Sequence, residues 1–192
     1  MNLFRKLANR TTPIDETALH YIWLSLACGF ASAAARELIS AYHGAGAVYA
    51  EEDFSSRTDL SEPLRKRLSE KDLSDAQEIY KACREKGIGI LTYESDLYPS
   101  RLRTLTNPPA VLYYRGRITN LDCEPCVAVV GTRSVSRYGE EVTDWFGYEL
   151  AKSGAFVVSG LAKGADGIAH RAALRAGGNT VAVLGTAIDR VY

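Results

Sequence analysis

The sequence has no long apolar run and no apolar leader, and both absences bear on where the protein works. No stretch reaches the roughly 18–20 consecutive apolar residues that a membrane-spanning helix needs. Residues 1–12 mix basic and polar side chains and contain no apolar core of the length found in signal peptides. We therefore expect a cytoplasmic protein with no membrane partner.

Cysteine is scarce as well. In a chain without an export signal, four scattered cysteines predict no disulfide framework. Cys123 and Cys126 have the spacing of half a zinc knuckle, but no second Cys or His pair completes a tetrahedral site. Cys126 runs into a predicted strand, whereas a thioredoxin-like pair stands at the start of a helix. We predict a structural role for this pair and no bound metal.

Net charge is absent too, because 23 Lys and Arg balance 23 Asp and Glu. Bulk charge therefore does not indicate a nucleic-acid partner. The distribution is less even: between residues 101 and 137 every basic residue is arginine, opposed only by Asp122 and Glu124. Arginine suits bidentate phosphate contacts better than lysine does. An ordinary solvated face is the alternative interpretation of this segment, and the charge pattern leaves both open.

The first part of the chain has helical periodicity interrupted by glycines. Several short helices joined by glycine turns predict a small all-α module that resembles SAM or helix-hairpin-helix domains, which we assign to residues 1-72. The predicted helices lie between the Thr12–Pro13 cap and Gly29, after Ser32, after Ser61, and from about Asp72 to Lys86, with only a short apolar turn through Val48.

Beyond Gly87 the pattern changes to strands alternating with helices. Continuous β-branched runs predict strands buried on both faces, and hence a parallel sheet. We assign residues 73-192 to a Rossmann-like, doubly wound α/β domain that is incomplete at its C-terminus. The predicted strands are 88–93, 111–114, 127–130, 156–159 and 181–184, with proline breaks at 98–99 and 107–109 and helices around 142–150 and from 166 to 176.

Three of these strands, ending at residues 130, 159 and 184, are each followed directly by a glycine. Because the carboxyl ends of parallel strands lie at one edge of a sheet, we expect the loops 131–139 and 160–166 to meet there. Glycine allows close backbone approach, and hydroxyls and helix N-termini donate hydrogen bonds to anions. With Arg133 in one loop and Lys163 in the other, the sequence predicts a phosphate-binding pocket.

Other site types are disfavoured at this edge. The first loop is neither Gly-x-Gly-x-x-Gly nor a Walker sequence, so we predict no dinucleotide and no other cofactor. Asp166 and His170 stand four residues apart on one predicted helix and could form an acid–base pair. We prefer a structural role, in which Asp166 caps the helix and His170 packs beneath the loop, because no nucleophile accompanies them. We therefore expect a binding protein rather than an enzyme.

In combination, these motifs resemble the DprA/Smf family in order and spacing. The resemblance extends upstream to the lead-in of that family's Rossmann-like domain and to an N-terminal SAM-like module. The residues that carry it are Val127–Arg133, Ser136–Gly139, Ser159–Asp166 with Ala169–His170, Val181–Gly185 and Asp189–Tyr192, preceded by Tyr98–Pro99, Leu102, Pro108–Pro109 and Leu112–Gly116.

The resemblance implies binding of single-stranded DNA without sequence preference, and loading of the RecA recombinase in natural transformation. It also implies that Arg133 and Lys163 grip phosphates while hydroxyls and glycine amides add hydrogen bonds. The full set of residues that we assign to DNA and phosphate binding is Gly131, Thr132, Arg133, Ser134, Ser136, Arg137, Ser159, Gly160, Lys163 and Gly164.

The chain ends at Tyr192, where the family continues with further strands and helices. The part beyond is similar to the region through which relatives form homodimers and contact RecA, so the sequence does not predict either activity for this polypeptide alone. Two alternatives stay open. One is a Rossmann-like protein that binds or hydrolyses nucleotides, although a Pro-Gly-Gly-x-Gly-Thr loop is missing. The other is a truncated fragment without independent activity.

Overall fold

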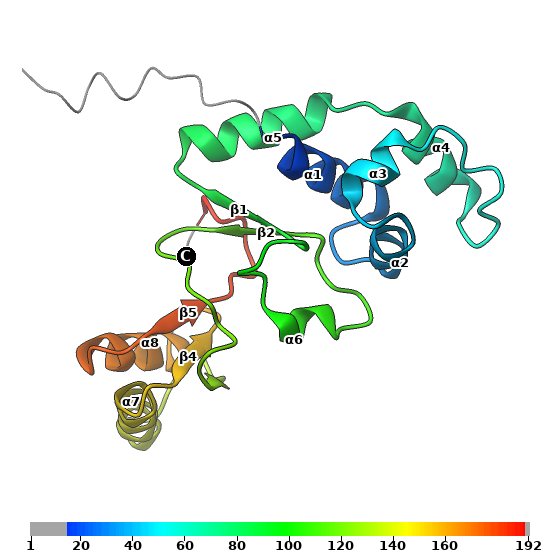
Figure 1. Ribbon diagram of the computed structural model, residues 1–192. Helices are drawn as coiled ribbons and strands as arrows, with labels where there is room; N and C mark the ends of the chain where they lie inside the picture. Colours follow the sequence, from blue (N-terminus) through cyan, green and yellow to red (C-terminus); the bar gives the residue numbers. More distant parts are fainter. Residues whose placement is uncertain (1–14, 191–192) are drawn as a thin grey trace, which may run out of the picture. The chain divides into compact units, whose positions relative to one another are not determined.

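The computed structural model describes residues 15–190, which form an α/β chain divided into two compact units (Figure 1). The first unit takes in the described residues up to Ser95 together with Thr104–Leu112. The second takes in Asp96–Arg103 and the described residues from Tyr113 onward. The mixture of helices and a parallel sheet confirms the predicted α/β class.

The first unit is built around one buried helix. Helix α1 packs against α3, α4 and α5, and its Tyr21, Ile22 and Leu24 are completely enclosed. Apolar residues therefore lie on most sides of α1, as expected of a helix at the centre of a small core. The helices of this unit are α1 (Glu16–Cys28), α2 (Ala33–Tyr42), α3 (Ala45–Ala50), α4 (Glu62–Glu70) and α5 (Ser74–Glu85).

The ends of these helices follow the predicted signals only in part. Gly29 ends α1 with a positive φ, as predicted. The cap predicted at Thr12–Pro13 lies outside the described residues, and Asp15 caps α1 by accepting from the Ala18 backbone N–H at 3.2 Å. Ser32 stands at the N-cap of α2, but its side chain makes no cap hydrogen bond within the described chain. The predicted turn through Val48 is wrong, because those residues form α3.

A small two-stranded sheet follows. It pairs β1 (Gly89–Thr92) with β2 (Val111–Tyr114), close to both predicted strands. The predicted absence of a helix between them is wrong, because α6 (Ser100–Arg103) forms a single turn directly after Pro99. Asp122 holds the start of this turn by accepting from the Ser100 backbone N–H at 2.8 Å. Proline ends the preceding segment but is compatible with a helix that begins immediately after it.

The second unit carries the parallel sheet that positions the candidate site. Its strand order is β3-β4-β5, with β4 (Phe156–Ser159) in the middle and β3 (Cys126–Ala128) and β5 (Thr180–Ala182) beside it. Helix α7 (Arg137–Lys152) connects β3 to β4, and α8 (Ala165–Arg175) connects β4 to β5. The predicted parallel pairing of these three strands is therefore confirmed, whereas the double winding stays a prediction.

Both helices pack on one face of the sheet and against each other. Val157 of β4 forms a small core with Ala151 of α7 and with Ala169 and Ala173 of α8. Figure 1 shows the two helices next to each other beside β4. Small residues at the contact allow the helix backbones to approach closely. Arg175 also donates two hydrogen bonds to the Asp144 carboxylate, at 2.9 and 2.6 Å, which join α8 to α7.

One expectation about burial is wrong, and two large side chains of α7 are exposed. Trp145 and Phe146 are 58% and 49% exposed. The outer strands were expected to be buried on both faces, yet Val130 and Val183, which follow β3 and β5, are 86% and 63% exposed. The packing of α7 and α8 on β4 is therefore made mainly by small residues, whereas Trp145 and Phe146 remain exposed.

No helix among residues 15–190 is long and apolar enough to cross a membrane. Within the same residues no three His, Cys, Asp or Glu side chains gather as metal ligands would. Cys123 and Cys126 both carry free thiols, and Cys126 donates to the Leu121 carbonyl at 3.4 Å. The Cys126 thiol thus closes the turn that precedes β3.

Candidate functional site

Two loops leave the sheet at the carboxyl ends of adjacent parallel strands. The first loop (residues 129–136) connects β3 to the start of α7, and the second loop (residues 160–164) connects β4 to the start of α8. Parallel pairing of β3 and β4 brings both loops to one edge of the sheet, where ligands bind in folds of this kind. All the residues predicted for DNA and phosphate binding lie in these loops, at the end of β4 or at the first position of α7.

The two loops are in direct backbone contact. The Ala165 backbone N–H donates to the Thr132 carbonyl at 3.1 Å. A Cβ added at Gly164 would lie 2.6 Å from the Arg133 carbonyl oxygen and 2.7 Å from the Arg133 Cα. Gly164 also has a φ of +86°, which disfavours other residues. Position 164, which follows Lys163 and packs on the backbone of Arg133, therefore accommodates only glycine.

Both predicted cations are on the surface. Arg133 and Lys163 are exposed, and Lys163 directly precedes the glycine that contacts Arg133. Two exposed cations on neighbouring loops repel each other weakly in water, and an anion bound at the junction would relieve that repulsion. The backbone geometry thus places both predicted cations at one junction.

The hydroxyl groups of the first loop mainly shape the loop itself. Thr132 Oγ1 accepts from the Ser134 backbone N–H at 3.2 Å and lies 3.3 Å from the Ser134 carbonyl. Ser136 is the N-cap of α7, where its Oγ accepts from the Gly139 backbone N–H at 3.2 Å. Thr132, Ser134 and Ser136 are all exposed, so their hydroxyls can also reach a ligand.

Two other predicted site residues have partners within the protein. The Ser159 hydroxyl is buried and donates to the Val129 carbonyl at 2.6 Å, which ties the ends of β3 and β4 together. Arg137 forms an exposed ion pair with Glu141, with Nε–Oε1 at 3.3 Å, one turn along α7. Exposed pairs of this kind contribute little energy, so Arg137 can exchange its partner for a phosphate.

Asp166 lies in the first turn of α8 and is turned back toward the second loop. Its Oδ2 accepts from the Gly160 backbone N–H at 3.1 Å and from the Ala162 backbone N–H at 3.4 Å. The N-cap position itself belongs to Gly164 and provides no side-chain hydrogen bond. Between the two amides stands Leu161, whose φ is +59°. The carboxylate therefore closes the second loop around a left-handed leucine.

His170 of α8 is buried against β5, with 5% of its surface exposed. The Thr180 hydroxyl donates to the Val157 carbonyl at 2.7 Å, so its oxygen accepts from His170 Nδ1 at 2.6 Å. Nε2 is enclosed and has no hydrogen-bond partner among residues 15–190. Burial lowers the pKa of His170, and the nearby Asp166 carboxylate and Ser159 backbone oppose this shift only in part. The lowered pKa favours the neutral form of the imidazole.

Sequence reasoning did not single out Leu161 or Val129. Leucine rarely adopts a left-handed backbone, so nothing in the sequence marks position 161 as special. Val129 acts through its carbonyl oxygen, which any residue would provide. The sequence offers one local signal for the shape of the second loop. Asp166 is the second residue of α8 and follows the glycine N-cap, Gly164, so its carboxylate is near the loop amides.

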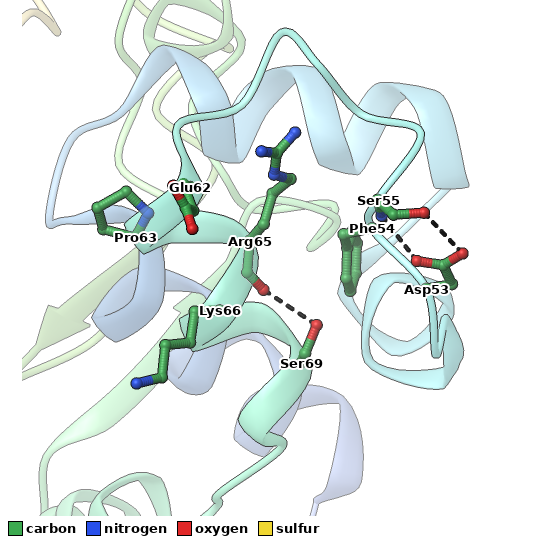
Figure 2. Close-up of a pocket in the computed structure, with 8 residues that line it drawn as sticks. All are labelled: Asp53, Phe54, Ser55, Glu62, Pro63, Arg65, Lys66 and Ser69. Atoms are coloured by element: carbon green, nitrogen blue, oxygen red, sulfur yellow. Dashed lines mark hydrogen bonds between the residues drawn. The ribbon is translucent and has the colours of Figure 1, made fainter.

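The first unit contains an open hollow of about 570 Å³ (Figure 2). Its charges are mixed, with Asp53 and Glu62 beside Arg65 and Lys66. Figure 2 shows the two basic side chains of α4 pointing in different directions, and Asp53 is occupied by hydrogen bonds from Ser55 at 2.7 and 2.9 Å. A hollow without convergent groups of one sign does not select a charged ligand, so the loop junction is the better candidate site.

The chain matches a family model over its C-terminal half. A family model described as DNA recombination-mediator protein A matches residues 89–192, more than half of the chain. DNA processing protein DprA of Bacillus subtilis is 37% identical over 111 residues, which cover 58% of this chain and 37% of that protein. DprA of Streptococcus pneumoniae is 44% identical over 101 residues, which cover 50% of this chain and 34% of the relative.

Solved structures give a similar result. The crystal structure of DprA from S. pneumoniae superposes with a TM-score of 0.56 at 27% identity, covering 90% of this chain and 60% of that one. DNA processing protein A from Helicobacter pylori, studied for its single-stranded DNA binding mode, is 36% identical over 54% of this chain and 46% of its own, with a TM-score of 0.47. The chain thus spans less than two thirds of the proteins that it matches.

Proposed function

Because this chain belongs to the DprA/Smf family of DNA-processing proteins, we propose that it binds single-stranded DNA without sequence preference. We place the DNA backbone at the junction of the first and second loops. The observation that carries the proposal is the contact of Gly164 with Arg133, which brings two exposed cations from separate crossovers to one sheet edge. A binding role rather than an enzymatic one is part of the proposal.

The chemistry of the junction suits a phosphate backbone. Arg133 offers a planar fork of donors and Lys163 a compact charge, and neither reads a base sequence. The exposed hydroxyls of Thr132, Ser134 and Ser136 add neutral donors beside them. Such a site attracts any strand through its phosphates, so we expect little discrimination between sequences.

The remaining features of the family are proposed for the whole protein. We propose a Rossmann-like fold for residues 73-192 and a SAM-like module for residues 1-72. We also propose that the complete protein forms a homodimer and loads RecA onto single strands. This chain spans 37% of the B. subtilis relative in their match, so these partners are proposed for the complete protein only.

The proposal is tested by titrating the chain with fluorescent oligonucleotides at several salt concentrations. We expect single strands of different sequence to bind alike, with a logarithm of affinity that falls linearly as the logarithm of salt concentration rises. Each phosphate contact to a single strand contributes about 0.7 to this slope, so Arg133→Ala and Lys163→Ala should each flatten it by about that amount.

Lys152→Ala is the matched control. It removes the same charge as Lys163→Ala, but from the opposite end of α7, roughly 24 Å of helix away from the first loop. We expect it to leave the slope unchanged. Slopes that stay the same in both loop variants would remove this junction from the DNA interface.

A further inference from the structure

The second loop holds an unfavourable backbone conformation at Leu161. Its φ of +59° lies in the left-handed region, which side chains with a Cβ seldom occupy. Leu161 is only half-buried, so packing of its side chain does not by itself account for this conformation. Something else in the loop must hold it in place.

The Asp166 carboxylate provides that restraint. The two N–H groups that it accepts, at 3.1 Å from Gly160 and 3.4 Å from Ala162, flank Leu161 on either side. Backbone N–H groups around a left-handed residue form a concave nest that favours an anion. Here the anion is a side chain of the same protein. The carboxylate fills the nest and thereby fixes the turn through Leu161.

The same loop is fixed at its other end by the first loop. Gly164 packs on the backbone of Thr132 and Arg133, and the Thr132 carbonyl accepts from the Ala165 N–H. Lys163 therefore stands between Ala162, which is bonded to Asp166, and Gly164, which contacts Arg133. The direction in which the Lys163 side chain leaves the backbone depends on both restraints.

We propose that Asp166 is a positioning residue, which holds the second loop in its left-handed turn and thereby places Lys163 beside Arg133. The inference rests on the proposed function, since it concerns the Lys163 contact with DNA. Asp166 itself contacts no phosphate, because a carboxylate would repel one. It acts by making the loop rigid before the strand arrives, which lowers the ordering cost of binding.

The test uses four variants of the 192-residue chain. Asp166→Asn keeps the size of the side chain but removes its charge. Leu161→Gly allows the left-handed backbone without strain. The double variant Asp166→Asn/Leu161→Gly tests whether the loop keeps its turn without the carboxylate once the strain at position 161 is removed. Asp166→Asn/Leu161→Ala is its matched control, because alanine trims the leucine side chain without relieving the backbone.

Two readouts are needed for each variant. Binding of an oligo-thymidine strand across salt concentrations reports the Lys163 contact. Amide hydrogen exchange at Gly160 and Ala162, followed by NMR, reports the nest without any DNA. For Asp166→Asn we expect faster exchange at both amides and a salt slope lower by about 0.7, the contribution of one contact. Leu161→Gly in this background should restore the slope, and Leu161→Ala should not.

The outcomes separate this inference from the function on which it rests. If the unaltered chain binds no single strand, the proposed function fails, and the role of Asp166 in DNA binding fails with it. If the chain binds but Asp166→Asn keeps its slope, the positioning role is wrong while the function stands. Equal slopes for the glycine and alanine double variants would show that Asp166 only stabilises the fold, which also overturns the inference.

Discussion

At the scale of single residues, Gly164 is the most constrained position of the candidate site. It combines a φ of +86° with direct contact to the backbone of Thr132 and Arg133. For Gly164→Ala we expect a loss of about 3 kcal/mol in unfolding free energy, from backbone strain of about 1–2 kcal/mol and overpacking against backbone atoms that cannot move aside. Urea denaturation followed by circular dichroism measures this change in unfolding free energy.

Gly154 provides the control for that substitution. Its φ is +94°, but an added Cβ would meet nothing within 4 Å. Gly154→Ala should therefore cost only the backbone strain, about 1 kcal/mol. Equal losses at positions 154 and 164 would mean that the two loops are not packed as described.

His170 gives the protein a pH dependence with a definite sign. Its pKa is lowered in the folded state, chiefly by burial, whereas an unfolded histidine titrates near about 6.5. As pH falls below that value, the unfolded chain takes up a proton first, so the unfolding free energy decreases until the folded pKa is passed. The stabilisation is fully present above pH ~6.5 and lost toward acid.

The comparison with His170→Gln isolates this contribution. His20 also has its pKa lowered by burial, so the unaltered chain loses stability in the same window for a second reason. Urea denaturation of the unaltered chain and of His170→Gln is recorded from pH 7.5 to 5. The unfolding free energy of the unaltered chain minus that of the variant should decrease as pH falls. A difference that stays constant across this range would show that His170 is not the titrating group.

The sequence predicted the common edge at which the two loops lie, but not the hydrogen bonds that shape them. The glycines after β3 and β4, with Arg133 and Lys163 beside them, indicated one common edge, and the structure has both loops there. The left-handed turn at Leu161 could not be predicted, because it depends on hydrogen bonds accepted by Asp166 from two other residues. The buried bond from Ser159 to Val129 likewise depends on strand pairing.

At the scale of elements, the contact between α7 and α8 depends on a glycine inside a helix. A Cβ at Gly147 would lie 2.9 Å from the Ala169 carbonyl oxygen and 3.1 Å from the Ala172 Cβ. Alanine is normally favoured over glycine in a helix by about 1 kcal/mol. Here we expect Gly147→Ala to destabilise the chain by about 1–2 kcal/mol, because α8 must move away.

The measurement is again urea denaturation, with Glu149→Ala on the exposed part of α7 as the control. That substitution touches no packed surface and should change the unfolding free energy by less than about 0.5 kcal/mol. Stabilisation by Gly147→Ala would contradict the close approach of the two helices.

Elements with a clear apolar pattern were predicted well, whereas two short helices were not predicted. Residues 156–159 were predicted as a strand and form β4, and α8 begins within one residue of its prediction. Helices α3 and α6 were missed, because six and four residues are too short to show helical periodicity. The exposure of Trp145 and Phe146 does not follow from their apolar character, because the α7–α8 contact is made by small side chains.

At the scale of the whole molecule, net charge is zero, so attraction to DNA must come from a local arrangement of cations. The first loop carries Arg133 and the second Lys163, while α7 carries acidic residues such as Glu140, Glu141 and Asp144 along its length. A strand should therefore follow the sheet edge and avoid the body of α7. Salt dependence should be modest, as expected of few phosphate contacts.

We propose that residues 131–136 and 160–164 form one DNA-binding junction. An NMR titration of the ¹⁵N-labelled chain with oligo-thymidine tests this junction directly. Amide signals of both loops should then shift together along a single saturation curve, while those near Lys152 stay in place. Shifts confined to one loop, or shifts that avoid both, would contradict the account.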